Sequence, residues 1–170
     1  MRKMLNNKVL RGLLLLLLMA AVCLLPFPKN MDITQSAILW RSSNPEDVQS
    51  TTVTLQGTYW DYLLREDKFD GSIRAEALPK TYGEMSIVPL GNGQLGLWYA
   101  DEEMLMKSFG GMFLSKDGSV LLLIHEEGHW DAEQGLMLTA PASTREEAVA
   151  LANAMAKELS PNWLGTYTFK

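Results

Sequence analysis

Apolar and polar residues alternate along much of the chain after residue 50, in short segments separated by turn residues. The stretch TTVTLQGTYW at 51–60 places Val53, Leu55 and Tyr59 on one face and mostly polar residues on the other. Alternation with a period of two is typical of strands that bury one face. The pattern therefore predicts half-buried antiparallel strands.

Two hairpins are predicted from Asn-Gly and Asp-Gly turns. The segments EMSIVPL and QLGLWYA flank GNG at 91–93, and GGMFLS and VLLLIHE flank the pair Asp117-Gly118. Asn-Gly and Asp-Gly supply the positive φ angles that tight hairpin turns require. With LMLTA at 136–140 and a short edge strand expected at 164–169, the pattern predicts six or seven strands.

The period changes near the C-terminus, where STREEAVALANAMAKEL at 143–159 repeats its apolar residues at helical intervals. Ser143 stands three residues before Glu146, which is the spacing of a capping box, and Pro161 ends the segment. The predicted fold is therefore one α+β domain at 51–170, with a mainly antiparallel sheet and a single C-terminal amphipathic helix.

Residues 1–28 differ from the rest of the chain and predict an export segment. Basic residues precede an uncharged apolar run of 16 residues from Gly12 to Phe27. As a helix rising about 1.5 Å per residue, this run covers roughly 24 Å, slightly less than a ~30 Å hydrocarbon core. Its length leaves a cleaved signal peptide and a retained signal-anchor membrane helix both open.

The residues around the apolar run favour a retained anchor, because small residues are poorly placed for a cleavage site. Cys23 follows Ala20-Ala21-Val22 and gives lipidation as a third alternative. Residues 1–29 hold five Lys or Arg and no acid, so the C-terminal domain is expected outside the cytoplasm, at the cell membrane or secreted after cleavage. Residues 29–50 are mostly polar, with a short apolar patch at Ile38-Leu39-Trp40, and predict a tether with one anchoring strand or contact.

Charge and cysteine content exclude several classes of function. The chain has 15 Lys and Arg, of which five lie in 1–29, so 10 remain against 20 Asp and Glu and residues 30–170 carry a net charge of −10. That balance argues against a nucleic-acid partner. Cys23 is the only cysteine, so the exported domain has no disulfide and no thiolate metal site.

One segment matches a catalytic motif: HEEGH at 125–129 fits H-E-x-x-H of zinc metallopeptidases. In that alternative His125 and His129 bind zinc and Glu126 is the general base. The chain has only two histidines, so the third ligand would be a carboxylate on a later helix, Glu146 or Glu147. A small zinc metallopeptidase is accordingly the alternative function.

The surroundings of the motif favour a strand and a turn instead of the helix that a zinc peptidase needs. Asp117-Gly118 upstream predicts a hairpin, and the polar stretch EEGHWDAEQG from Glu126 has too few apolar residues to continue an amphipathic helix. This interpretation places His125 at the end of a strand and His129 in the following turn. It assigns no catalytic residue, no metal ligand and no cofactor.

Aromatic residues supply a second alternative, a glycan-binding module. Trp60-Asp61-Tyr62 and Trp98-Tyr99 are the densest groups and would serve if their rings formed an exposed platform. Docking to another envelope protein by strand addition is a further way for this chain to bind a partner.

The segments GTYWDYLLREDKFDGSI at 57–73 and TAPASTREEAVALANAMA at 139–156, behind a basic and leucine-rich N-terminus, resemble a group of small membrane-anchored or secreted proteins of Gram-positive bacteria. The resemblance implies location in the bacterial cell envelope and the fold, and it implies no activity or site residue. Together these observations predict a non-enzymatic interaction or envelope-associated module that reaches the membrane through its N-terminal helix.

Overall fold

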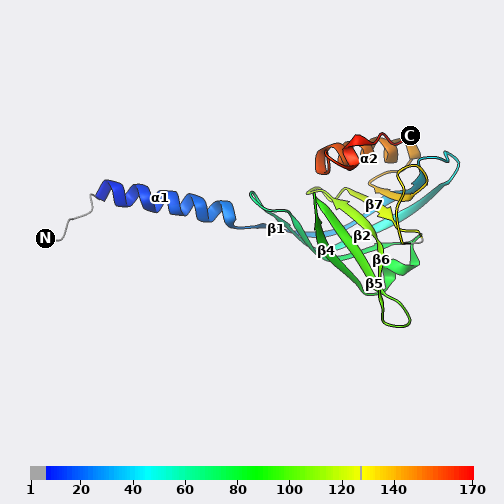
Figure 1. Ribbon diagram of the computed structural model, residues 1–170, viewed down its shortest axis with the longest axis horizontal. Helices are drawn as coiled ribbons and strands as arrows, with labels where there is room; N and C mark the ends of the chain where they lie inside the picture. The colour runs from blue at the N-terminus through cyan, green and yellow to red at the C-terminus, as the bar shows by residue number, and fades with distance from the viewer. Residues whose placement is uncertain (1–6, 127) are drawn as a thin grey trace.

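The computed structural model describes residues 7–126 and 128–170. An N-terminal helix precedes a sheet, and a second helix packs on the sheet near the C-terminus (Figure 1). The helices are α1 (Asn7–Leu24) and α2 (Arg145–Leu159), with short 3-10 turns at Pro79–Tyr82 and Leu164–Thr166. The strands are β1 (Phe27–Arg41), β2 (Val48–Asp61), β3 (Lys68–Ala75), β4 (Met85–Gly91), β5 (Gln94–Ala100), β6 (Met106–Leu114), β7 (Val120–Ile124) and β8 (Leu136–Ala140).

The eight strands form one antiparallel sheet in the order β3-β2-β1-β8-β7-β6-β5-β4. Successive strands are neighbours except for β3 and β4, which form the two edges of the sheet, and the last strand, β8, pairs with the first, β1. The sheet curls so that its two edge strands, β3 and β4, contact each other. The result is a curled layer with an enclosed inner face and an outer face.

Both faces of the sheet are buried where β7 crosses its centre. Val120, Leu122 and Ile124 belong to the core inside the curl, whereas Leu121 and Leu123 belong to the outer core beneath α2. Successive strand residues point to opposite faces, so a strand covered on both sides is apolar throughout. This is the physical reason for the uninterrupted VLLLI run.

Helix α2 covers the outer face through small residues on one side. Ala148, Ala152, Met155 and Ala156 are buried and recur at the intervals of one helical face. The Thr144 hydroxyl accepts a hydrogen bond from the Glu147 backbone N–H at 3.3 Å, and it caps the helix. The C-terminal amphipathic helix is thus confirmed.

The capping box lies one residue later than the spacing of Ser143 and Glu146 predicted. Thr144 is the cap, and the Glu147 carboxylate accepts from the Ser143 backbone N–H at 2.8 Å. Two adjacent hydroxyl residues and two adjacent acids make both registers plausible from sequence alone. Hydrogen bonding by the backbone at the helix start decides between them.

The α+β class and the mainly antiparallel sheet are confirmed, but six or seven strands was too few. The one anchoring strand expected within the tether at 29–50 is longer than predicted: it is β1, which begins at Phe27 and pairs with β2 over 14 residue pairs up to Trp40. The first half of β1 is mostly exposed on both faces, so it lacks the apolar alternation that identifies a strand. The edge strand expected at 164–169 is a 3-10 turn followed by irregular chain.

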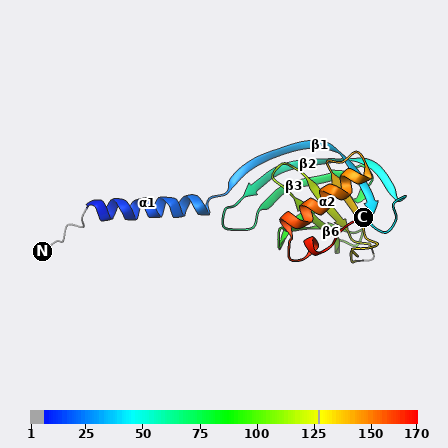
Figure 2. The same cartoon turned by 90° about the horizontal axis from the view of Figure 1, so that it is seen from above.

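The N-terminal segment forms the helix α1, which projects from the sheet (Figure 2). Within residues 7–126 and 128–170, no helix reaches the combined length and apolarity needed to cross a membrane. The side chain of Cys23, the candidate for lipidation, lies outside those that the structure describes.

Candidate functional site

The curled sheet has two ends with different surroundings (Figure 1). At the proximal end α1 joins the start of β1, and the loops 62–67, 92–93 and 115–119 turn the chain. At the distal end the loops 42–47, 76–84, 101–105 and 125–135 join the strands. HEEGH belongs to the last of these loops and therefore lies at the distal end, away from α1.

The HEEGH segment is a tight turn and not a helix. The Glu126 backbone N–H donates to the His129 carbonyl at 3.1 Å, and the His129 N–H returns a bond to the Glu126 carbonyl at 3.2 Å. Gly128 supplies the positive φ, +87°, that closes the turn. The motif spacing therefore does not set His125 and His129 one helical turn apart, as a zinc peptidase requires.

The three glutamates of the zinc-peptidase alternative lie in different surroundings. Glu126 is bonded to an arginine, Glu147 caps α2, and Glu146 lies in the exposed first turn of that helix. Hydrogen bonds at the helix start lower the Glu146 pKa. In the part of the chain that the structure describes, no three His, Cys, Asp or Glu residues are grouped as a metal ion would need.

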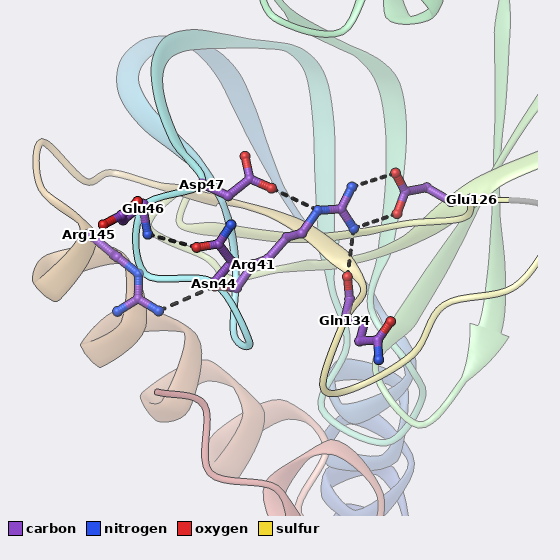
Figure 3. Close-up of polar contacts among 7 residues, drawn as sticks. All are labelled: Arg41, Asn44, Glu46, Asp47, Glu126, Gln134 and Arg145. Atoms are coloured by element: carbon purple, nitrogen blue, oxygen red, sulfur yellow. Dashed lines mark hydrogen bonds and ion pairs between the residues drawn. The ribbon is translucent and has the colours of Figure 1, made fainter.

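Arg41, at the end of β1, binds the Glu126 carboxylate through both branches of its guanidinium (Figure 3). Arg41 Nη1 donates to Glu126 Oε2 and Nη2 to Oε1, each at 2.6 Å. This fork geometry is the strongest form of the arginine–carboxylate pair. The Arg41 hydrogen bond lowers the pKa of Glu126, so the group that a zinc peptidase would use as a base is held ionised.

The same guanidinium joins two distal loops. Arg41 Nε donates to Asp47 Oδ2 at 2.9 Å in the loop 42–47, and Nη1 also donates to the Gln134 carbonyl at 2.6 Å in the loop 125–135. Figure 3 shows Asp47 and Glu126 approaching Arg41 from opposite sides. His129 and Asp131 line a hollow beside this cluster. Arg41 therefore positions the loop that carries HEEGH.

His125 lines a second, deeper site on the other side of Glu126. Its Nδ1 lies 2.9 Å from the Ser108 hydroxyl, and its backbone N–H donates to the Phe109 carbonyl at 2.9 Å. Phe109 is an extra residue on β6, because Leu97 pairs with Gly110 while Trp98 pairs with Ser108. Such a bulge re-aims side chains next to it. It sets Ser108 against the histidine.

These residues form the distal cleft, a cavity of about 350 Å³ open to solvent. Its apolar surface comes from Leu78, Phe109, Ile124 and Leu136. Its polar surface comes from Lys80, Tyr99, Ser108, His125 and Glu126. An apolar surface with a few converging polar groups is the usual character of a small-molecule site.

The charges around the distal cleft leave one cation unopposed by a lining carboxylate. Glu126 is neutralised by Arg41, whereas the Lys80 ammonium lies 3.2 Å from the Tyr99 hydroxyl and 5.0 Å from the centre of its ring. Burial, and then the nearby His129, lower the pKa of His125, so its imidazole is neutral at pH 7. The cleft therefore combines a positive charge with neutral hydrogen-bonding groups.

The serine–histidine contact lacks the third group of a catalytic triad. In nucleophilic serine sites the base is itself oriented by another side chain, commonly a carboxylate. Among the described residues, His125 has Ser108 as its side-chain partner, and Glu126 is engaged by Arg41.

The aromatic groups proposed for glycan binding do not come together as a platform in the described part of the chain. Trp60 and Trp98 are half-buried on β2 and β5, and neither takes part in an aromatic pair. Tyr99, the neighbour of Trp98, instead packs edge-on to Phe109 beneath the distal cleft.

Reasoning from the sequence identified His125 and Glu126, named Tyr99 only as an aromatic residue for glycan binding, and missed Arg41, Ser108 and Lys80. These residues come from separate strands and loops, and no motif spacing connects them. Comparisons with protein-family models, with curated proteins and with solved structures found no match. The distal cleft is thus the feature from which a function can be inferred.

Proposed function

We propose that this protein is a non-enzymatic, extracytoplasmic binding module, held at the membrane by its N-terminal segment, which binds a small amphipathic carboxylate in the distal cleft. The observation that carries the proposal is that the Lys80 ammonium lines the same cleft as Ser108, His125 and an apolar surface. A carboxylate would lie against Lys80, and its hydrocarbon part would cover Phe109 and Leu136.

The sequence and the course of the chain support the location. Four basic residues and no acid precede the apolar run that begins at Gly12, which is the charge pattern of a segment retained on the cytoplasmic side. The leucines of α1 whose side chains are described are exposed, with Leu10 at 46% and Leu16 at 70%. Burial of such a surface in lipid would be favourable. The distal cleft would then face away from the membrane.

The ligand class follows from the balance of charge and apolar surface in the distal cleft. A neutral apolar ligand would make no charged contact with Lys80, whereas an inorganic anion would not cover the apolar lining. A short carboxylate satisfies both, since charge-assisted hydrogen bonds to an ammonium are stronger than neutral ones. Hexanoate is a suitable probe because it is soluble in water.

Equilibrium dialysis of the full chain in lipid nanodiscs, with radiolabelled hexanoate, tests the proposal. Saturable binding is expected, and hexanol, which matches the chain length without the charge, should compete weakly. Lys80→Met should weaken hexanoate binding about tenfold or more, the effect of losing roughly 1.4 kcal/mol of a charge-assisted bond.

The matched control is Lys68→Met, which removes an exposed lysine at the proximal end and should leave hexanoate binding unchanged. Equal affinity for hexanoate and hexanol, or equal losses in the two lysine variants, would contradict the proposal.

A further inference from the structure

At the proximal end, the β2–β3 loop exposes two adjacent leucines. Leu63 and Leu64 have 59% and 69% of their surface accessible, although both are large apolar residues. Leu90 on β4 is 52% exposed, and Phe27 at the start of β1 is 51% exposed. Exposed apolar side chains therefore occur on β1 and β4 at this end as well as in the loop.

The register of the first two strands sets this loop level with the end of α1. Phe27 pairs with Asp61 at the last position of the β1–β2 ladder, and only two residues separate Phe27 from Leu24, the last residue of α1. Each extended residue advances about 3.3 Å, so Leu63 and Leu64 can reach up to roughly 7–10 Å beyond this pair. Figure 2 shows the loop extending toward the side on which α1 lies.

Hydrogen bonds fix the base of the loop that carries Leu63 and Leu64. Asp67 accepts from the Tyr62 backbone N–H at 2.9 Å and from the Tyr59 hydroxyl at 2.6 Å. Glu66 accepts from the Asn92 backbone N–H at 2.9 Å and joins the loop to the neighbouring turn. Burial of Tyr59 and its bond to Asp67 raise the pKa of the phenol, so it remains a donor.

We propose that this loop inserts Leu63 and Leu64 into the interface of the lipid bilayer that α1 enters, as a second contact between the domain and the membrane. The proposal rests on the membrane anchoring in the proposed function. Trp60 and Tyr62 flank the site half-buried, and aromatic residues of this kind favour the headgroup level of a bilayer.

The contact is apolar and does not depend on anionic lipid. Acidic residues outnumber basic residues in the domain, and the loop base contains Asp61, which is paired with Lys116 at 2.7 Å. A domain of net negative charge has no overall attraction to anionic headgroups. The insertion is therefore expected in neutral phosphatidylcholine and should change little when anionic lipid is added.

A fluorescent label at residue 64 tests the insertion in the full chain. Cys23→Ser removes the only native thiol, Leu64→Cys supplies the labelling site, and the chain is reconstituted into phosphatidylcholine liposomes carrying a spin-labelled lipid quencher. Met104→Cys is the matched control, because Met104 is an apolar residue, 81% exposed, in the distal loop 101–105. We expect quenching at residue 64 to be several-fold stronger than at residue 104.

Co-sedimentation with the same liposomes separates the two proposals. If the chain sediments but residues 64 and 104 are quenched equally, the leucine pair lies in water, available to a protein partner, and the insertion is wrong while the anchoring stands. If the chain does not sediment, the anchoring is wrong and the insertion fails with it. Leu63→Asp beside the label should reduce quenching without releasing the chain from the liposomes.

Discussion

Replacing Arg41 by Met should destabilise the distal end, because one guanidinium there bonds Glu126, Asp47 and the Gln134 carbonyl. The side chains of Arg41 and Glu126 are 25% and 49% exposed, so solvent weakens their attraction. Exposed pairs contribute about 0.2–1 kcal/mol, and the two-branched geometry favours the upper end. Adding about 0.5–1.5 kcal/mol for the bond to the carbonyl gives a total of roughly 1.5–2.5 kcal/mol.

A double-mutant cycle isolates the part that belongs to Arg41 and Glu126. Urea unfolding of the full chain in nonionic detergent would compare Arg41→Met, Glu126→Gln and the double variant, and a coupling of about 1 kcal/mol is expected. The control cycle uses Lys68→Met and Asp70→Asn, an exposed pair at 3.4 Å, for which we expect coupling near zero. Equal coupling in the two cycles would refute the reasoning.

The Arg41–Glu126 coupling should also depend on pH in a defined direction. The pKa of Glu126 is lowered in the folded protein, chiefly by the hydrogen bond from Arg41. Its contribution is therefore fully present above the ordinary glutamate pKa of about 4.3 and is lost as the pH falls through the lower folded value. The cycle repeated at neutral pH and at successively lower pH, wherever the chain remains folded, should show that decline.

Three other predictions concern the cleft and the fold. Because burial lowers the His125 pKa, the free energy of unfolding should decrease as the pH falls below about 6.5, the pKa of an unfolded histidine. His125→Gln should reduce this pH dependence, as measured by urea unfolding at several pH values. Gly110→Ala should destabilise the fold by about 3 kcal/mol or more, because its new Cβ would lie 2.1 Å from the Leu123 carbonyl oxygen. In the control Gly83→Ala the nearest atom to the new Cβ is 3.7 Å away, so thermal unfolding should show only a small loss of stability. Thr144→Ala should cost about 1 kcal/mol through the lost helix cap, measured in the same way, and no change would exclude the cap.

Features set by a few neighbouring residues could be predicted from the sequence. The hairpins follow from Asn92-Gly93 and Asp117-Gly118, where the structure has positive φ at Asn92, Gly93 and Gly118. The C-terminal helix follows from its apolar spacing and ends before Pro161. The turn at HEEGH was also correctly expected, because polar residues there could not continue an amphipathic helix.

Features that depend on contacts between distant parts of the chain could not be predicted from the sequence. The first half of β1 is stabilised mainly by its hydrogen bonds to β2, so its own side chains carry little signal of a strand. Arg41 and Glu126 are 85 residues apart, and Ser108 on β6 is 17 residues from His125, which follows β7. Only the strand order and the bulge at Phe109 bring these groups together. Glu126 was identified as a candidate, but its partner and its role were not.

The most direct test of the distal cleft as a ligand site is the imidazole NMR signal of His125 during titration of the full chain with hexanoate. His129, which lies outside the cleft in the following turn, serves as the internal reference. We predict a saturable shift of the His125 signal with hexanoate, little change with hexanol, and loss of the shift in Lys80→Met. A His125 signal that does not move, or that moves equally in Lys80→Met, would contradict binding at the cleft.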